Sequence, residues 1–468
     1  MFWRKKHFFI KSKYNVKQKF WETTLDMVLQ NGNEDRFASY ETTFTLPEGC
    51  WISDYYLYVG NKKEKGILAE KKSALWIFKQ IRNENRDPGI LYYLTGNRIS
   101  FKVFPFGKNE IRKTGITFIH KEPTVLNIDS NQVVLGDKET KAPRIETTAN
   151  ATYIPSSEKA KLTLAQRKPI YHFIIDVSKD NAQFKKSFVE RIENYITRNK
   201  IDKNNIKINF TNSYALPVAY SNNWRKKLAD HTCEGGYYLG GAIKKTILNS
   251  YAQLNNSYPI IIAVTNNIEN AIVLNDFADL QFTFPESAFF YELDTQNKIW
   301  EHSLINNPLQ KFKQINEIDT KSLVFAWPNT SKPIAYLANN NLPSIVMNKK
   351  LVKFENREKN NWEAGLQMQV LWRESLINPD RGKDQHLEMI KFSMINQILS
   401  PVTSFIVVEN VAQKKALKRK QDQILNGNKN LDTDEDTQSM SEPSLVLLLI
   451  LVALVYTIKQ NLLRTVKT

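Results

Sequence analysis

The pattern of apolar and polar residues predicts a strand-rich first part of the chain. Between residues 16 and 125, short stretches alternate apolar and polar residues, and turn signals at residues 47–49 and 87–89 interrupt them. These stretches predict strands at residues 37–46, 51–59, 98–104 and 111–119. Residues 70–83 have helical spacing, with apolar residues recurring on one side. The first part is therefore expected to be a compact β domain that carries one helix.

From residue 167 the pattern changes to continuous apolar stretches separated by amphipathic ones. The apolar stretches predict buried strands at residues 169–175, 206–210, 258–265 and 288–293. The amphipathic stretches predict helices at residues 183–199 and 238–254. Buried strands that alternate with helices indicate a mostly parallel sheet with helices on both faces. This α/β domain is expected to span residues 167–295.

The other segments have their own patterns. Residues 1–15 form a basic N-terminal segment, and residues 126–166 are polar and turn-rich, as expected of a connector. Residues 296–411 combine strand pieces with helices at 361–376 and 384–399, an α+β region expected to pack on the preceding domains. Residues 412–439 are charged and contain no aromatic residue, which predicts a flexible linker.

Residues 445–458 are almost purely apolar and are expected to form a C-terminal transmembrane helix. At about 1.5 Å per residue they cover about 21 Å, less than a hydrocarbon core of about 30 Å, so a buried core helix is the alternative. Their position after an acidic stretch and before a basic tail favours the membrane. The same charges place the C-terminus in the cytoplasm and the bulk of the chain outside. No apolar stretch of signal-peptide length follows residue 1.

Composition limits the kinds of partner and metal site that can be expected of this chain. With 468 residues, 42% of them hydrophobic and 24% charged, the chain is long enough for several folded domains. The net charge of +17 is spread along the whole sequence, which favours a solvated basic surface over a nucleic-acid groove, so no nucleic-acid partner is expected. The only two cysteines, Cys50 and Cys233, exclude a disulfide scaffold and a cysteine-based zinc cluster.

Several short motifs of the first part resemble a VIT domain, the vault protein/inter-α-trypsin type. They are LPEG at residues 46–49, WISD at 51–54, EKKSA at 70–74, RDPG at 86–89 and VFPF at 103–106. Tyr92 and Tyr93 stand where the family usually has an acidic residue. The resemblance implies a β-sandwich that holds one helix, at residues 16–125. The segment 400–410 resembles the closing segment of proteins that combine such a domain with an α/β domain.

The second part resembles a von Willebrand A-type (vWA) domain. In that family a motif after the first strand, a threonine in a middle loop and a later aspartate hold a magnesium-type ion. Here the first motif is Asp176, Ser178 and Asp180, but the loop at 235–241 and the strand end at 264–267 lack the expected residues. The resemblance is compatible with two interpretations. In one, these three residues bind a divalent cation weakly. In the other, which is favoured, the fold serves only for shape and protein interaction. No cofactor is expected.

Residues Met440, Ser441, Glu442 and Pro443 precede the apolar run and the basic tail. This three-part C-terminus resembles the MSEP variant of the PEP-CTERM sorting signals, which bacterial membrane exosortases recognise. The resemblance implies a protein sorted to the cell envelope. The expected fold class is therefore multidomain: a β-sandwich VIT domain with one helix, a doubly wound vWA-like α/β domain, and a C-terminal transmembrane helix.

Three functions follow from these features. The favoured one is a non-enzymatic bacterial envelope protein, with the membrane, an exosortase and an unidentified protein ligand as partners. The alternative is a cytoplasmic, tail-anchored scaffold. An enzyme is not expected, because His172 lies within a predicted strand. The residues His231 and Cys233, which flank a glycine loop, have no third orienting group.

Overall fold

The computed structural model describes residues 3–32, 38–83, 88–137, 143–348, 359–379, 382–408 and 411–425. The chain divides into two compact units, residues 1–417 and 418–468. Within the described ranges, no helix combines the length and the apolar character that a membrane span requires. The expected transmembrane segment at 445–458 and the sorting motif at 440–443 lie outside the described residues.

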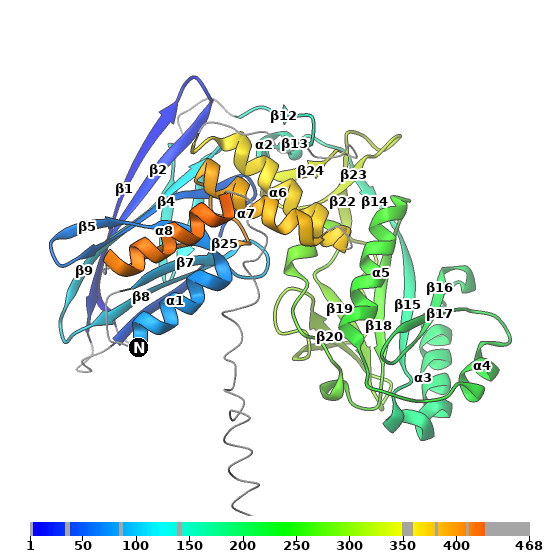
Figure 1. Ribbon diagram of the computed structural model, residues 1–468. Helices are drawn as coiled ribbons and strands as arrows, with labels where there is room; N and C mark the ends of the chain where they lie inside the picture. Colours follow the sequence, from blue (N-terminus) through cyan, green and yellow to red (C-terminus); the bar gives the residue numbers. More distant parts are fainter. Residues whose placement is uncertain are drawn as a thin grey trace, which may run out of the picture. The chain divides into compact units, whose positions relative to one another are not determined.

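The first domain is a β-sandwich of two five-stranded antiparallel sheets, called the sandwich domain below (Figure 1). One sheet has the order β1-β2-β9-β4-β5: β1 (Trp3–Asn15), β2 (Phe20–Asn31), β9 (Ile111–His120), β4 (Cys50–Val59) and β5 (Lys62–Lys65). The other has the order β3-β8-β7-β25-β6: β3 (Ala38–Thr45), β8 (Arg98–Phe106), β7 (Gly89–Tyr93), β25 (Thr403–Val407) and β6 (Ile67–Glu70). The hairpin of β10 (Thr124–Ile128) and β11 (Asn131–Leu135) adds apolar side chains to the same core.

The alternation in the sequence explains the sandwich. In β3 every second residue is buried and the residues between them are half-buried or exposed, as a strand with one face on a core requires. Helix α1 (Lys71–Asn83) covers one sheet and buries the four apolar residues that recur on one side of it, Ala74, Ile77, Phe78 and Ile81. The predicted β-sandwich with one helix is confirmed.

Strand β25 comes from the far end of the folded chain. Its residues pair antiparallel with β7 on one side and with β6 on the other, so β25 joins β6 to the rest of the sheet. Phe405, Ile406 and Val407 are almost completely buried. The segment 403–407 was expected within the region 296–411, yet it completes the sandwich domain.

Three expected boundaries differ in the structure, and one is residue 295, because the strands Ile299–Ser303 and Lys311–Ile315 extend the α/β sheet beyond it. Residues 1–15 are not a separate segment, because β1 pairs with β2 from Asn15 and Phe20 outward and extends the first sheet. The expected linker 412–439 begins with a helix, α8 (Val411–Leu425). Leu417 of α8 packs in the cluster that α1 forms with the sheet, and Lys414 Nζ donates to Glu64 Oε2 at 2.7 Å. A single buried leucine in a lysine-rich stretch was too weak a signal to predict this contact.

The α/β domain is a seven-stranded sheet in the order β17-β16-β15-β18-β19-β20-β21. Its strands are β15 (Lys168–Asp176), β16 (Ile206–Thr211), β17 (Ala215–Ala219), β18 (Ser257–Val264), β19 (Phe289–Leu293), β20 (Ile299–Ser303) and β21 (Lys311–Ile315). Strands β16, β15, β18 and β19 are parallel, and the outer ones are antiparallel. The order, with successive strands on either side of β15, is that of a doubly wound fold.

Helices cover both faces of this sheet, as predicted. Helix α3 (Lys185–Arg198) packs its apolar side on one face, and α5 (Leu239–Gln253) lies on the other (Figure 1). The shorter helices are α4 (Trp224–Asp230) and the 3₁₀ turns η1 (Lys179–Phe184), η2 (Lys203–Asn205), η3 (Ile268–Asn270) and η4 (Ala278–Thr283). Continuous apolar strands are buried because both of their faces are covered.

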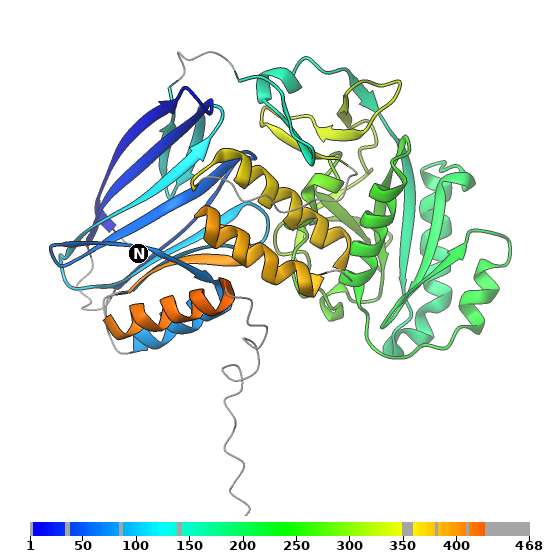
Figure 2. The same cartoon turned by 45° about the horizontal axis from the view of Figure 1, so that its top comes forward.

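Two small sheets and a helix pair make up the rest. The sheets are β12 (Glu146–Thr147), β13 (Ala151–Ile154) and β24 (Ser344–Met347), and β14 (Leu164–Gln166), β22 (Leu323–Trp327) and β23 (Ala335–Ala338). The expected connector thus contributes strands to both, as well as the short helix α2 (Ser156–Lys159). Helices α6 (Trp362–Ile377) and α7 (Gly382–Asn396) run side by side (Figure 2).

A buried histidine in the sandwich domain gives a pH prediction. The His120 Nδ1 atom lies 2.9 Å from the carbonyl oxygen of Glu122, and Nε2 lies 2.9 Å from the hydroxyl of Thr23. Burial lowers the pKa of His120 to about 4. The unfolded chain, with an ordinary histidine pKa near 6.5, takes up the proton first, so the free energy of unfolding falls as pH drops from about 6.5 towards 4.

The shift corresponds to a loss of about 3 kcal/mol across that range. Urea unfolding at several pH values should show a shallower pH dependence for His120→Gln than for the parent chain. The control is His7→Gln, which changes an exposed histidine on β1 and should leave the curve of the parent. Identical curves for the parent and His120→Gln would contradict the prediction.

Candidate functional site at the carboxyl edge of the α/β sheet

Four loops meet at the carboxyl edge of the parallel strands, where ligands of doubly wound folds bind. They follow β15, β16 and β18 or precede α5, and backbone hydrogen bonds join them. Val177 N donates to Thr211 O at 2.9 Å, Tyr238 N to Asn212 O at 2.9 Å and Ile272 N to Tyr237 O at 2.7 Å. The edge is therefore one continuous loop surface built on the ends of the strands.

Asp176 lies at the centre of this edge and is buried. Its Oδ1 accepts the backbone N–H of Ser178 at 2.9 Å. Its Oδ2 accepts from Thr265 Oγ1 at 2.6 Å and from Asn181 Nδ2 at 2.9 Å. The same Asn181 amide also donates to Ser178 Oγ at 3.0 Å. Asp176 thus joins the ends of β15 and β18 through hydrogen bonds.

This arrangement gives the three residues predicted to bind a cation different surroundings. The Asn181 amide nitrogen donates to both Asp176 and Ser178, the two oxygens that a cation would share. The third expected ligand, Asp180, is exposed. The resemblance places Tyr237 or Tyr238 at the threonine position, and the Tyr237 hydroxyl donates to the carbonyl oxygen of Ile174 at 3.0 Å. In the part of the chain that is described, no group of three or more acidic, histidine or cysteine side chains is placed to hold a metal.

Burial raises the pKa of the Asp176 carboxyl above its ordinary value, although hydrogen bonds from Ser178 and Thr265 lower it. A buried carboxylate is costly unless donors satisfy it, and here the donors are side chains and one amide of the protein. Sequence reasoning found Asp176 and Ser178 but missed Asn181 and Thr265 as their partners. Neither residue carried a local signal, because Thr265 is the last residue of a predicted strand and Asn181 lies six residues beyond the end of another.

The hydrogen bonds of Asn181 give a prediction for this edge. Asn181→Ala removes two donated bonds and should lower the free energy of unfolding by about 1–3 kcal/mol. Asp180→Ala is the control, since an exposed side chain should change stability by less than about 0.5 kcal/mol.

Magnesium at millimolar concentration should produce no binding heat in calorimetry. A magnesium-dependent rise in the unfolding temperature, lost in Asp180→Ala, would contradict this arrangement.

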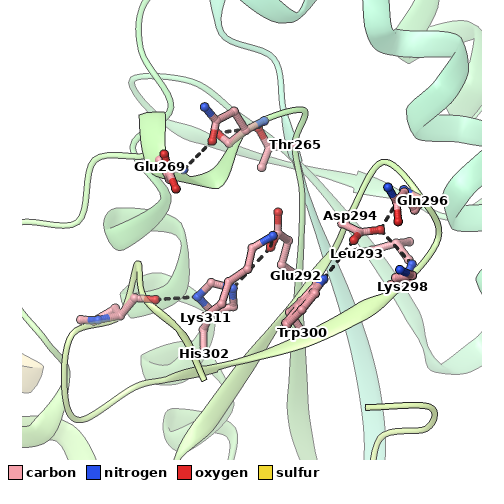
Figure 3. A network of polar contacts seen from close by, with 12 residues as sticks. Thr265, Glu269, Glu292, Leu293, Asp294, Gln296, Lys298, Trp300, His302 and Lys311 are labelled. Carbon is pink, nitrogen blue, oxygen red and sulfur yellow. Dashed lines mark hydrogen bonds and ion pairs between the residues drawn. The ribbon is translucent and has the colours of Figure 1, made fainter. Parts of the chain in front are cut away.

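A second polar network lies on the neighbouring strands of the same sheet, as Figure 3 shows. Glu292 of β19 is buried, and its Oε2 lies 3.0 Å from Lys311 Nζ of β21 and 3.5 Å from His302 Nε2 of β20. The His302 Nδ1 atom lies 2.9 Å from the carbonyl oxygen of Pro308, so Nδ1 donates there. The network joins three consecutive strands. Sequence reasoning missed it, because only the sheet pairing brings the three residues together.

Arg191 of α3 links the carboxyl ends of two neighbouring parallel strands, β18 and β19. It is buried, and its Nη1 donates to the carbonyl oxygens of Thr265 and Leu293, both at 3.0 Å. The guanidinium lies 4.8 Å from the centre of the Phe188 ring. Arg191 therefore fixes the spacing of the β18 and β19 ends, which carry the loops of the edge.

The three residues considered for catalysis are not brought together. His172 lies in β15, where the sheet and α5 surround it, away from the carboxyl edge. The His231 ring packs against Phe210 with centroids 5.3 Å apart, and no hydrogen bond between described residues joins it to Cys233. Burial raises the pKa of the Cys233 thiol, which makes it a poorer nucleophile.

The edge exposes large apolar side chains. Tyr214, Tyr238 and Leu274 have exposed fractions of 61%, 43% and 87%, and Leu216 of β17 has 43%. Their loops are hydrogen-bonded to one another, since Asn212 N donates to Tyr214 O and Asn212 O accepts from Tyr238 N. We call Tyr214, Leu216, Tyr238 and Leu274 the edge surface. Exposed apolar groups on neighbouring loops are a candidate protein-binding surface.

Comparison with known proteins bears on the sandwich domain. No curated protein matches the chain. The family model described as the vault protein inter-alpha-trypsin (VIT) domain matches residues 10–118, a range that begins within β1 and ends within β9. This match, together with the two five-stranded sheets, identifies the first part of the chain as a VIT domain.

Proposed function

We propose that this chain is a non-enzymatic bacterial envelope protein that binds another protein through its folded part and is sorted by an exosortase. The VIT domain is a protein-interaction domain, which agrees with an interaction role. The α/β domain, with its resemblance to vWA domains, supplies the second binding module. The observation that carries the proposal is the edge surface, where apolar side chains are exposed around a buried, hydrogen-bonded Asp176.

The chemistry of the edge favours contact by shape and apolar area over metal-mediated contact. In a metal-dependent interface, a partner's carboxylate would complete the coordination of an ion at Asp176. Here Asn181 and Thr265 already satisfy that carboxylate. Tyrosine is enriched at the centres of protein interfaces, since its ring supplies area and its hydroxyl a hydrogen bond. The edge surface offers two such tyrosines.

In-cell crosslinking would test the interaction. A photo-crosslinking residue at position 274 should give a discrete adduct, and Tyr214→Ser with Tyr238→Ser should abolish it. The matched control is position 323 in β22, where Leu323 is also exposed. The tyrosine changes lie on exposed side chains, so the unfolding temperature should not change. The same adducts from positions 274 and 323 would contradict a specific edge contact.

Sorting needs a separate experiment, because its motif at residues 440–443 lies outside the described residues. The mass of the C-terminus should be measured for protein from cells with and without the exosortase. Loss of the residues beyond the motif, only when the exosortase is present, would support an exported and sorted envelope protein. An intact residue 468 under both conditions would instead favour the cytoplasmic, tail-anchored scaffold.

A further inference from the structure

A cavity of about 370 Å³ lies between helix α5 and the face of the α/β sheet formed by β15, β16 and β17. It is on the side of α5 and is distinct from the edge surface, since its strand residues belong to the early and middle parts of β15 and β16. Its volume falls within the range of about 300–1,000 Å³ that is usual for small-molecule sites.

The sheet wall of the cavity combines apolar residues, such as Ile170 and Val218, with three polar or charged ones. His172 of β15 and its register partner Lys207 of β16 line it, with Asn209 two residues further along β16. The residues between them point to the opposite face, where Phe173 and Ile208 belong to the apolar core under α3. On the cavity side, β15 carries His172 between the apolar residues Ile170 and Ile174, so the polar groups are set into a partly apolar face.

The helix wall follows the same pattern. Ala242, Thr246, Asn249 and Gln253 line the cavity at spacings of four, three and four residues, which form one stripe of the helix. Their neighbours Ile243 and Ile247 are buried in the apolar cluster on this face of the sheet. Small and polar residues on the helix wall leave this space unfilled.

The charges around the cavity have one sign. Lys207 and Lys245 line it, and none of the described residues that line it is an aspartate or a glutamate. Lys245 Nζ uses one of its donors on the carbonyl oxygen of Ala215, at 3.1 Å. The Asn209 Nδ2 atom is buried and has no hydrogen-bond partner in the described structure. An unsatisfied buried donor is costly, and a turn of the Asn209 side chain towards the cavity would let an acceptor oxygen there satisfy it.

We propose that this cavity binds a small organic anion, with its carboxylate or phosphate oxygens held by the Lys207 and Lys245 ammonium groups and by the Asn209 amide. The Thr246 hydroxyl does not compete for the same oxygens, because it donates to the carbonyl oxygen of Ala242 at 2.8 Å. Asn249 and Gln253 offer further donors and acceptors for the body of the ligand. The proposal is independent of the edge surface and of sorting.

Titration calorimetry on the full-length chain tests the proposal, with inorganic phosphate, citrate and neutral glycerol as probes. At least one anion should bind in the submillimolar range, and glycerol should not bind. The double variant Lys207→Gln with Lys245→Gln should weaken the anion about tenfold or more, because two charge-assisted contacts are lost. Phosphate and citrate measured separately distinguish a phosphate-bearing ligand from a carboxylate-bearing one.

Lys244→Gln is the matched control, since this adjacent lysine of α5 does not line the cavity and should leave the affinity unchanged. Lys207 and Lys245 are exposed at the cavity rim, so their replacement should not change the unfolding temperature. Asn209→Leu should weaken the anion without changing the net charge, which separates recognition from general attraction. Absence of binding at millimolar anion, or equal weakening by Lys244→Gln, would overturn the proposal.

Discussion

A chain that ends at residue 398, before β25, will not fold its VIT domain. Without β25, strands β6 and β7 lose their shared neighbour, and each gains an open edge. The sandwich also loses Phe405 and Val407 from its core and Ile406 from the α1 face. The match to the VIT family covers only residues 10–118, so a domain cut from the chain at those bounds should fail in the same way.

The comparison is with a chain that ends at residue 425, which retains β25 and α8. The longer chain should unfold cooperatively in urea, whereas the shorter one should aggregate or lack that transition. Phe405→Ala in the full chain is a milder version and should cost about 3–5 kcal/mol. Equal unfolding transitions for the two truncated chains would show that β25 is dispensable.

Trp362→Ala will also destabilise the chain strongly, by about 3–5 kcal/mol, because it leaves a cavity where the indole ring packs at the start of α6. Trp362 is buried, and its Nε1 donates to the carbonyl oxygen of Gly49 at 2.8 Å. Its ring lies 5.2 Å from the Trp51 ring and 5.0 Å from the Tyr153 ring, measured between centroids. The side chain therefore joins α6 to β4 and β13 at once.

Trp76→Ala is the control, since Trp76 on α1 is 45% exposed and should cost far less. Trp362→Phe separates packing from hydrogen bonding, because it keeps a ring but leaves the Gly49 carbonyl without its donor. Urea unfolding of the three variants should rank Trp362→Ala as the least stable and Trp76→Ala as close to the parent. A loss in Trp76→Ala as large as in Trp362→Ala would contradict this account.

Local patterns predicted well those helices and strands that pack against an apolar core. The stretch 258–265 became β18, and the helix expected at 361–376 became α6, each within a residue or two. Partners far apart in the sequence could not be predicted. Nothing local to residues 403–407 indicates that they lie between β6 and β7, because strand propensity does not encode which neighbour a strand will pair with.

The candidate site shows the same limit. Asp176 and Ser178 stood out because they follow a buried strand, and a family resemblance gave them a metal-binding interpretation. Whether an ion or an amide lies beside them depends on Asn181 and Thr265, whose side chains come within reach of Asp176 only in the folded domain. The cavity under α5 was equally hidden, since a polar residue in a strand does not reveal which wall it faces until the register of the sheet is known.

The position of β25 also has a mechanical consequence. Because β25 is hydrogen-bonded along both sides to antiparallel neighbours, a force that pulls the chain beyond residue 408 acts along the strand. Such a force must shear the hydrogen bonds on both sides together, whereas a strand peeled from an edge breaks its bonds one after another. The last strand of the folded chain thus holds the second sheet of the VIT domain together. Tension applied from the C-terminal side would reach this domain before the α/β domain.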